Sequence, residues 1–498
     1  MTYDVIIGLE IHAALKTESK MFCTCPNVSE APANTVVCPI CLGHPGTLPS
    51  PNMAAIESTI LLGMALGCRI NRLSRFDRKQ YFYPDLPKGY QISQSELPLA
   101  YSGRLRVNDK VISITRLHLE EDTGKLNHPP FEDYSLVDYN RAGTPLVELV
   151  TEPIIPDAAT AKAFAQRYQQ ILRYLGLASA DIEKGEMRCE ANISLQKKGG
   201  WQYKDGQIMA LGNNKLNNKV EVKNIGSFRS LEKAIDFEIN RQTKMLENNE
   251  HIKAETRGWN DQKNITIGQR VKESSADYRY FPDPDIPPFK LSPTFLRNIK
   301  LRLKELPEAR EERFRQEYTL SEEEAILLCA DKELSDYYEK VISELGAWVE
   351  AQGDSWARHD KKLPKLAANW LLNEYTKLKK IHPEKTALIT AENMAEFILL
   401  VYHDKINSSA AQSILEKMFL GGGEPTHIMA EQGLEQLDDE EQLRQTVTKV
   451  FAAFPDQTSE YKNGKVSLLQ FFIGQVMAET KGKANPQKVK KILEELNT

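Results

Sequence analysis

The stretch Glu186-Met-Arg-Cys-Glu-Ala-Asn-Ile-Ser-Leu195 alternates strictly between polar and apolar side chains. A period of two residues is typical of a β-strand that packs one face on a core and leaves the other face polar. The polar face of this predicted strand carries Glu186, Arg188, Glu190, Asn192 and Ser194. These groups favour binding of a hard cation or a phosphate, although an ordinary solvated sheet face is the plainer alternative.

The beginning of the chain has the same pattern between Asp4 and Leu15, where Glu10 and His12 share one face. The apolar face opposite is formed by Val5, Ile7, Leu9 and Ile11. A carboxylate and an imidazole two residues apart on a strand can share a metal ion or a proton, but alone this pair is a weak signal. A third alternating segment projects Lys219, Glu221 and Lys223 to one side.

These strands belong to a region of short alternating segments and turns that ends near residue 290, after the proline-rich stretch Phe281–Pro288. Beyond it the sequence has the period and charge pattern of helices, for example at Leu363–Leu378 and Ala410–Phe419. We therefore predict an α+β fold in which a sheet domain over residues 1–292 precedes a helical domain over 293–408 and a helical tail over 409–498.

A further acidic cluster, His118-Leu-Glu-Glu-Asp-Thr-Gly124, ends a predicted strand. Alternation puts His118 and Glu120 on the polar face and Glu121 on the apolar one, but a turn at Asp122 could re-aim Glu121. Glu255 adds another acid beside an arginine. Many carboxylates with one histidine favour magnesium over zinc. Since no glycine-rich phosphate-binding motif occurs, any nucleotide must be held by the sheet surface and its metal ions.

Four cysteines lie close together as Cys23-Thr-Cys25 and Cys38-Pro-Ile-Cys41. In a reducing compartment this spacing predicts a structural zinc site on the loop of residues 22–48, with an unmetallated or redox-active cluster as the alternative. Four thiolates leave no open position for substrate, so the reaction is not expected here. A zinc-dependent hydrolase built on these cysteines is the rival hypothesis.

The bulk composition restricts location and partners. The chain has 498 residues and a net charge of -5, so it has no overall electrostatic attraction to nucleic acid. We expect a cytoplasmic protein, because the N-terminus has no signal-peptide pattern and no segment approaches the ~20 apolar residues of a membrane span. A local basic patch in the tail could nevertheless contact RNA, and it consists of Lys481, Lys483, Lys488, Lys490 and Lys491. A solvated lysine-rich helix is its alternative meaning.

Several of these segments together resemble one known family. The matching motifs are Gly8–His12, Phe76–Gln94, His118–Gly124, Asn140–Glu148, Arg188–Leu195 and Asp277–Pro284. They occur in the same order over essentially the whole chain, and they resemble the B subunits of bacterial aspartyl/glutamyl-tRNA(Asn/Gln) amidotransferases.

This resemblance implies an enzyme subunit that uses ATP and Mg²⁺ to phosphorylate the side-chain carboxylate of Glu-tRNA(Gln) or Asp-tRNA(Asn). Ammonia from a separate amidase A subunit then displaces the phosphate, and a small C subunit completes a heterotrimer. The implied fold is a cradle similar to glutamine synthetase, followed by helical domains that bind tRNA. A non-catalytic tRNA-binding scaffold is the alternative function.

The resemblance also implies the magnesium ligands Glu10, His12, Glu121, Glu190 and Glu255, and so chooses Glu121 where alternation favours Glu120. By their position on the polar faces, Arg188, Asn192 and Lys223 are predicted to contact phosphate and substrate. The predicted catalytic residues are Arg188 and the ligands Glu10, His12, Glu121 and Glu190. The chain departs from relatives in two features. The segment 196–218 is expected to be an extended loop with no assigned role, and the cysteine quartet is absent from some family members.

Overall fold

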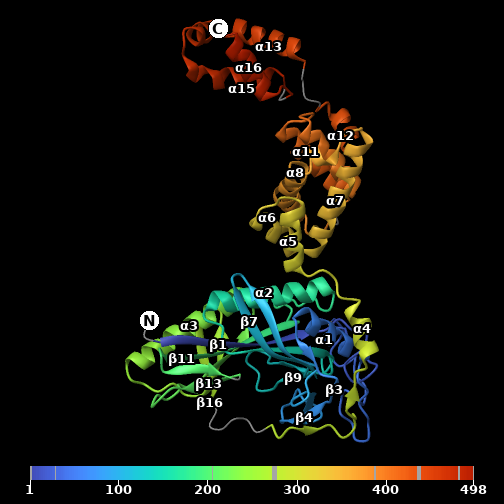
Figure 1. Cartoon of the computed structure of the whole chain (residues 1–498), viewed down its shortest axis with the longest axis vertical. Coiled ribbons are helices and arrows are strands. Elements are labelled where there is room, and N and C mark those ends of the chain that lie inside the picture. Colours follow the sequence, from blue (N-terminus) through green and yellow to red (C-terminus); the bar gives the residue numbers. More distant parts are fainter. Residues whose placement is uncertain are drawn as a thin grey trace. The chain divides into compact units, whose positions relative to one another are not determined.

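The structure, a computed structural model, describes residues 3–28, 30–204, 206–271, 278–385, 388–434, 439–480 and 483–496. It divides into two compact units, Met1–Leu306 and Pro307–Thr498 (Figure 1). The first unit is a sheet covered by helices and the second is helical, which confirms the predicted α+β fold class. Within the described residues, no helix is long and apolar enough to cross a membrane.

One large sheet of nine strands organises the first unit. In spatial order its strands are β16 (Ile265–Val271), β15 (Glu255–Asn260), β14 (Val220–Ile225), β11 (Met187–Lys197), β1 (Tyr3–Ala14), β10 (Pro145–Thr151), β7 (Lys110–Glu121), β6 (Ala100–Val107) and β2 (Arg69–Ile70). The expected antiparallel sheet is corrected at one place, because β14 and β15 pair in parallel. A connection that includes a helix joins these two strands, and it returns the chain to the end of the sheet from which β14 started.

The apolar face of this sheet packs on helices α1 (Met53–Ala65), α2 (Ala158–Leu175) and α3 (Phe228–Glu247). Ile7, Leu9 and Ile11 of β1 have no exposed surface, and they join the side chains of all three helices in one core. The predicted alternation of β1 and β11 is confirmed, since Glu10, His12 and Glu190 on the opposite face are only partly buried. The helices therefore leave one polar face of the sheet available to a ligand.

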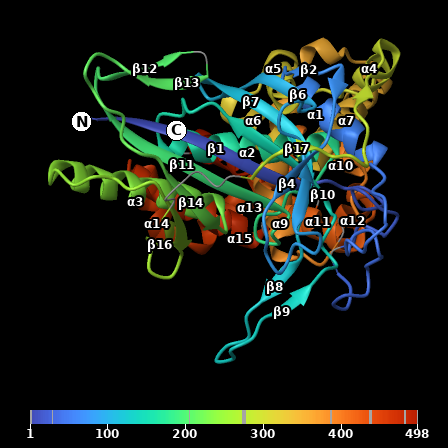
Figure 2. The ribbon, with the colours of Figure 1, turned by 90° about the horizontal axis from the view of Figure 1, so that it is seen from below.

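Smaller sheets and hairpins surround the large sheet (Figure 2). Their strands are β17 (Phe281–Pro282), β4 (Asp77–Gln80) and β5 (Tyr90–Ser93); β18 (Phe289–Lys290) and β3 (Leu73–Ser74); β12 (Trp201–Lys204) and β13 (Gln207–Ala210); and β8 (Lys125–Asn127) and β9 (Leu136–Asp138). Figure 2 shows the β8–β9 hairpin projecting from the sheet. The segment 196–218 was expected to be an extended loop, but it contains the β12–β13 hairpin.

The first unit extends beyond the boundary expected at residue 292. Helix α4 (Pro293–Lys300) packs on α1, and its Ile299 is only 2% exposed in the same core. The helix starts at Ser292, whose hydroxyl accepts a hydrogen bond from the amide of Phe295. The sheet unit therefore ends at Leu306, because α4 belongs to its core.

The second unit is helical, and its described residues form two hydrophobic clusters. The first cluster involves α5 (Pro307–Glu317), α6 (Glu322–Ala330), α7 (Lys332–Ala351), η1 (Trp356–Arg358), α8 (Leu363–Trp370), η2 (Leu371–Tyr375), α9 (Thr376–Ile381), α10 (Ala391–Tyr402), α11 (Ser408–Gly421) and α12 (Pro425–Gln432). The second involves α13 (Glu440–Ala453), α14 (Pro455–Lys462), η3 (Val466–Leu468), α15 (Leu469–Glu479) and α16 (Pro486–Glu495).

The helices predicted at Leu363–Leu378 and Ala410–Phe419 are confirmed, the first with a π-helical turn at η2. The domain boundary expected at residues 408/409 does not coincide with the boundary between the two hydrophobic clusters. Helices α11 and α12 bury Met418, Ile428 and Met429 in the first cluster, so the second begins only at Leu443.

A buried arginine joins the first helices of the second unit. Arg310 of α5 is 7% exposed, lies 2.6 Å from Asp336 of α7 and also pairs with Glu339. Burial opposes ionisation of both carboxylates, but Lys332 and Arg310 lower the pKa of Asp336, and Arg313 and Arg310 lower that of Glu339. Carboxylates with lowered pKa values stabilise the fold above their unfolded pKa values near 4 and lose this contribution as the pH falls.

We predict that Arg310→Met destabilises the helical unit by about 2 kcal/mol at pH 7, since two charge-assisted contacts lose their donor. The variant is also expected to lose less stability than the wild type between about pH 5 and pH 2. Calorimetry of the full chain at several pH values measures both effects. Arg358→Met is the control, because Arg358 is 76% exposed and its pair with Asp354 is expected to contribute little. Equal pH dependence in wild type and Arg310→Met would contradict the prediction.

Candidate functional site

The polar face of the large sheet carries rows of functional side chains that are aligned by strand pairing. One row crosses four strands: His118 of β7 pairs with Glu148 of β10, Glu148 with His12 of β1, and His12 with Arg188 of β11. In the next row Glu10 pairs with Glu190, and beyond it Asn192 pairs with Glu221 of β14. Antiparallel partners project to the same face, so strands that are distant in sequence build one surface.

His12, Glu120 and Glu148 form the first cluster on this surface. Nε2 of His12 lies 3.3 Å from Oε1 of Glu120 and 3.2 Å from Oε2 of Glu148, which also lies 3.1 Å from Nε2 of His118. Burial lowers the pKa of His12, but the Glu148 and Glu120 carboxylates outweigh it and raise that pKa well above its ordinary value. Burial opposes ionisation of Glu148 too, yet His118 and His12 hold its pKa well below the usual range. One ligand atom each of His12, Glu120 and Glu148 lies within 4.8 Å of the others, so this cluster could hold a metal ion, as the family resemblance implies for His12.

Glu10, Glu190 and Glu221 form the second cluster, and one oxygen of each lies within 4.8 Å of the others. Burial raises the pKa of Glu10, and the neighbouring carboxylates of Glu148, Glu190 and Glu221 raise it further. The ammonium group of Lys223 lies 2.9 Å from Glu190 and 3.3 Å from Glu221. Lys223 thus balances part of the negative charge of the three carboxylates. Their oxygens are the type of ligand that Mg²⁺ prefers.

Cations border both clusters. Arg188 pairs with the buried carboxylate of Asp122, and its side chain is 38% exposed. Asn192 donates a hydrogen bond of 2.8 Å to Glu10. Lys79 lies 5.0 Å from the ring centre of Tyr278, and although burial opposes its charge, Glu120 is foremost among the groups that raise its pKa. The predicted phosphate contacts Arg188, Asn192 and Lys223 therefore all lie around the carboxylates.

Two expected magnesium ligands lie elsewhere. Strand β7 continues in regular alternation to Glu121, so Glu120 faces His12 while Glu121 accepts hydrogen bonds from Lys88 at 2.6 Å and from the amide of Ile92 at 3.0 Å. No bend re-aims Glu121 toward His12.

Glu255 of β15 pairs in register with the core residue Val220, which directs its side chain to the helix-covered face. There it lies 3.2 Å from Arg241 and 3.0 Å from Arg257. The expected ligands Glu10, His12 and Glu190 are brought together on the polar face, whereas Glu121 and Glu255 are not.

Sequence reasoning assigned no role to Glu148, which lies at the centre of the first cluster. The available signal was its position as the one charged residue of the apolar strand Pro-Leu-Val-Glu-Leu-Val-Thr at 145–151. A carboxylate in such a strand requires a partner if it is buried. Sequence reasoning also assigned no role to Lys79. In the structure its ammonium group lies near the aromatic rings of Tyr81 and Tyr278.

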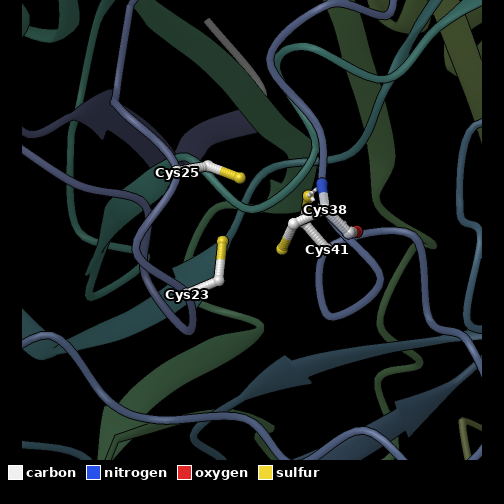
Figure 3. Close-up of side chains that lie close together, drawn as sticks. All are labelled: Cys23, Cys25, Cys38 and Cys41. Atoms are coloured by element: carbon white, nitrogen blue, oxygen red, sulfur yellow. Dashed lines mark hydrogen bonds between the residues drawn. The ribbon is translucent and has the colours of Figure 1, made fainter.

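The four cysteines form a separate cluster. Sγ atoms of Cys23, Cys25, Cys38 and Cys41 lie within 4.8 Å of one another and point toward a common centre (Figure 3). A tetrahedral zinc–thiolate site has sulfurs about 3.8 Å apart, so this donor set fits a metal ion after small adjustments. A hydrogen bond from Cys23 lowers the pKa of Cys41 to about 4, and Lys20 also favours the thiolate. These residues fit a structural metal site.

The β12–β13 hairpin closes one end of the polar face. Trp201 donates a hydrogen bond of 2.9 Å to Asp4, and Tyr203 donates one of 2.5 Å to Glu152. A pocket of about 370 Å³ lies between the hairpin region and the strands. Its lining includes Glu10, Asn192, Gln196, Ile208 and Leu216.

The basic patch of the tail lies on and before α16. Lys483, Lys488, Lys490 and Lys491 are exposed, while Val489, Ile492 and Leu493 of the same segment are buried. Lys490 and Lys491 each lie 3.9 Å from a glutamate one turn later. Lys481 lies outside the described residues.

We predict that Glu221→Gln lowers the affinity of the full chain for Mn²⁺, used as a Mg²⁺ substitute, by about tenfold or more, because the second cluster loses a charged ligand. Isothermal titration calorimetry measures this change. Glu132→Gln, which alters an exposed carboxylate of the β8–β9 loop, is the matched control. Equal affinities in both variants would show that this cluster does not bind the ion.

Comparison with known proteins identifies the family. A family model described as the GatB/GatE catalytic domain matches residues 5–297, and one described as the GatB domain matches residues 354–496. The chain is 41% identical to the B subunit of the aspartyl/glutamyl-tRNA(Asn/Gln) amidotransferase of Thermotoga maritima, over 100% of this chain and 99% of the relative. It is 42% identical to the protein of the same name from Persephonella marina, with 100% of each chain covered. The chain therefore belongs to the family of aspartyl/glutamyl-tRNA(Asn/Gln) amidotransferase B subunits.

Proposed function

We propose that this chain is the synthetase subunit of a tRNA-dependent amidotransferase, a ligase that forms a carbon–nitrogen bond and hydrolyses ATP. It phosphorylates the side-chain carboxylate of Glu-tRNA(Gln) or Asp-tRNA(Asn), and ammonia then replaces the phosphate. The observation that carries this proposal is the convergence of Glu10, Glu190 and Glu221 beside Lys223 and Arg188 on one open sheet face. The names of the relatives support the tRNA-dependent reaction.

The residues of this face have separable roles in phosphoryl transfer. Glu10, Glu190 and Glu221 would hold Mg²⁺, which neutralises charge on the transferred phosphoryl group when it is bound. Arg188 and Lys223 supply fixed positive charge at the same surface, where it stabilises the equatorial phosphoryl oxygens. Asn192 holds the Glu10 carboxylate in place by its hydrogen bond. His12, between Glu120 and Glu148, offers a second set of ligand atoms that would suit a divalent cation.

Phosphorylation supplies the leaving group that amide formation requires. A carboxylate oxygen of the aminoacyl group attacks the γ-phosphorus, and ADP leaves. Ammonia then attacks the acyl carbon, phosphate leaves, and one proton passes to a base or to solvent. The ammonia comes from an amidase A subunit, and a small C subunit completes the heterotrimer, in agreement with the relatives' being named as one subunit of a larger enzyme. Zinc at the four cysteines has a structural role, because their thiolates leave no position for substrate.

We predict that Glu190→Ala in the assembled enzyme lowers the kcat of ADP and Gln-tRNA formation by about 10²-fold or more, since the metal cluster loses a carboxylate on the transferred phosphate. The assay contains Glu-tRNA(Gln), ATP, Mg²⁺ and glutamine, and Glu132→Ala is its control. Wild-type product levels from Glu190→Ala would refute the proposed site. They would favour the alternative function, a tRNA-binding scaffold whose reaction occurs on another subunit.

The tail lysines are proposed to contact the tRNA backbone. We predict that replacing both Lys488 and Lys491 by glutamine weakens tRNA binding and lowers the slope of log affinity against log salt by about one per lost phosphate contact. Filter binding at several salt concentrations measures the slope. Lys465→Gln is the control, because this lysine lies in the same unit and pairs with Glu460 at 2.7 Å. An unchanged slope would show that α16 does not contact phosphate.

A further inference from the structure

A turn at residues 139–144, between β9 and β10, connects the cysteine loop with the polar face. The loop of residues 22–48, together with Lys20 and Met21 immediately before it, contacts this turn at several points. The amide of Val36 donates a hydrogen bond of 2.8 Å to Oδ1 of Asn140, and the amide of Met21 donates one of 2.7 Å to the carbonyl of Gly143. Asn140 in return donates one of 2.7 Å to the carbonyl of Pro32. The conformation of the turn thus depends on the loop.

Lys20 lies at the centre of this contact and is only 1% exposed. Its ammonium group donates a hydrogen bond of 2.8 Å to the carbonyl of Val36 and lies 3.7 Å from Sγ of Cys41. Its stem packs against Gly143, where a Cβ atom would lie 3.4 Å from Cδ of Lys20 and 3.6 Å from Cβ of Cys41. Gly143 also has a φ of +89°, so its backbone disfavours a side chain there, and an added Cβ would be in ordinary van der Waals contact with Lys20.

The other side of the turn holds the partner of Arg188. The amide of Gly143 donates a hydrogen bond of 2.9 Å to the carbonyl of Asp122, and the amide of Asp122 donates one of 2.8 Å to the carbonyl of Thr144. The Asp122 carboxylate, 4% exposed as a residue, pairs with Arg188 and lies 3.0 Å from Arg141. Arg188 is partly exposed, and Asp122 fixes its direction.

We infer that Lys20 is a positioning residue for the reaction on the polar face, and that it acts on Arg188 through Gly143 and Asp122. A buried lysine stem and its hydrogen bond to Val36 keep the turn against the loop, and the turn keeps the Asp122 carboxylate at the guanidinium. This inference rests on the proposed role of Arg188 in phosphoryl transfer. It gives the cysteine loop a function for the reaction without placing a reacting group in it.

The first test measures hydrogen exchange in the full-length protein. Lys20→Ala is expected to raise amide exchange at residues 120–124 and 139–144 and to leave exchange in α2 unchanged. Lys20→Met retains most of the stem that packs on Gly143, so it is expected to have a smaller effect. Ile171→Val, a buried change in α2 that lowers overall stability, is the matched control. Unchanged exchange at both segments in Lys20→Ala would overturn the inference.

The second test is a double-mutant cycle on the assembled enzyme, followed by ADP formation. Lys20→Ala is expected to lower kcat about tenfold with little change in the KM for glutamine, because small displacements of a charge-stabilising group cost rate. In an Arg188→Met background, Lys20→Ala is expected to have no further effect. Additive effects, or a wild-type kcat in Lys20→Ala, would overturn the inference. If Arg188→Met itself retains the wild-type rate, the proposed function of Arg188 fails, and with it this inference, even where the exchange data show the coupling.

Discussion

The pairing of β1 with β11 is the constraint on which the rest of the structure depends. It runs in unbroken register from Tyr3 opposite Lys197 to Ala13 opposite Met187. This register sets Glu10 against Glu190 and His12 against Arg188, and it turns the apolar residues of both strands toward α2 and α3. A slip of one residue would exchange the two faces of one strand, placing carboxylates in the core and leucines in the site. Core formation and site assembly are therefore the same event.

The polar face accumulates negative charge that must be balanced within the protein. Glu10, Glu120, Glu148, Glu190 and Glu221 lie close together; Glu120, Glu148 and Glu221 are buried, and Glu10 and Glu190 are partly buried. Lys223 and Lys79 supply opposite charge within the site, and Arg188 adds a guanidinium that pairs with Asp122 and stays partly exposed. A substrate that brings phosphate and a divalent cation changes this balance locally, because the cation adds to the protein's own positive groups. The sheet is thus suited to bind a metal and a polyanion together.

The alternation of polar and apolar residues in the sequence predicted the fold class. It also predicted the sheet face on which Glu10, His12, Arg188, Glu190 and Asn192 lie. These features follow from local sequence, since the period of a strand determines which side chains share a face. Alternation could not predict the role of Glu148. The partners of Glu148 come from β1 and β7, and the order of strands in a sheet is a property of the whole fold. Glu255 was assigned a position that depends on the orientation of β15, and the parallel pairing with β14 directs it to the helix side. The domain boundaries were displaced for a similar reason, because α4, α11 and α12 are assigned by the core they enter.

The β12–β13 hairpin has a consequence for how this surface can diverge. It connects β11 to β14, which are neighbours in the sheet, so its length can change without shifting the register of either strand. Its anchors, Trp201 on Asp4 and Tyr203 on Glu152, attach at one end of the face, away from the row that joins His12 to Arg188. Substitutions or insertions in the hairpin can therefore change one wall of the pocket, while the strand register keeps the charged rows in place. Changes in the β12–β13 hairpin can thus alter substrate preference without altering the geometry of the sheet.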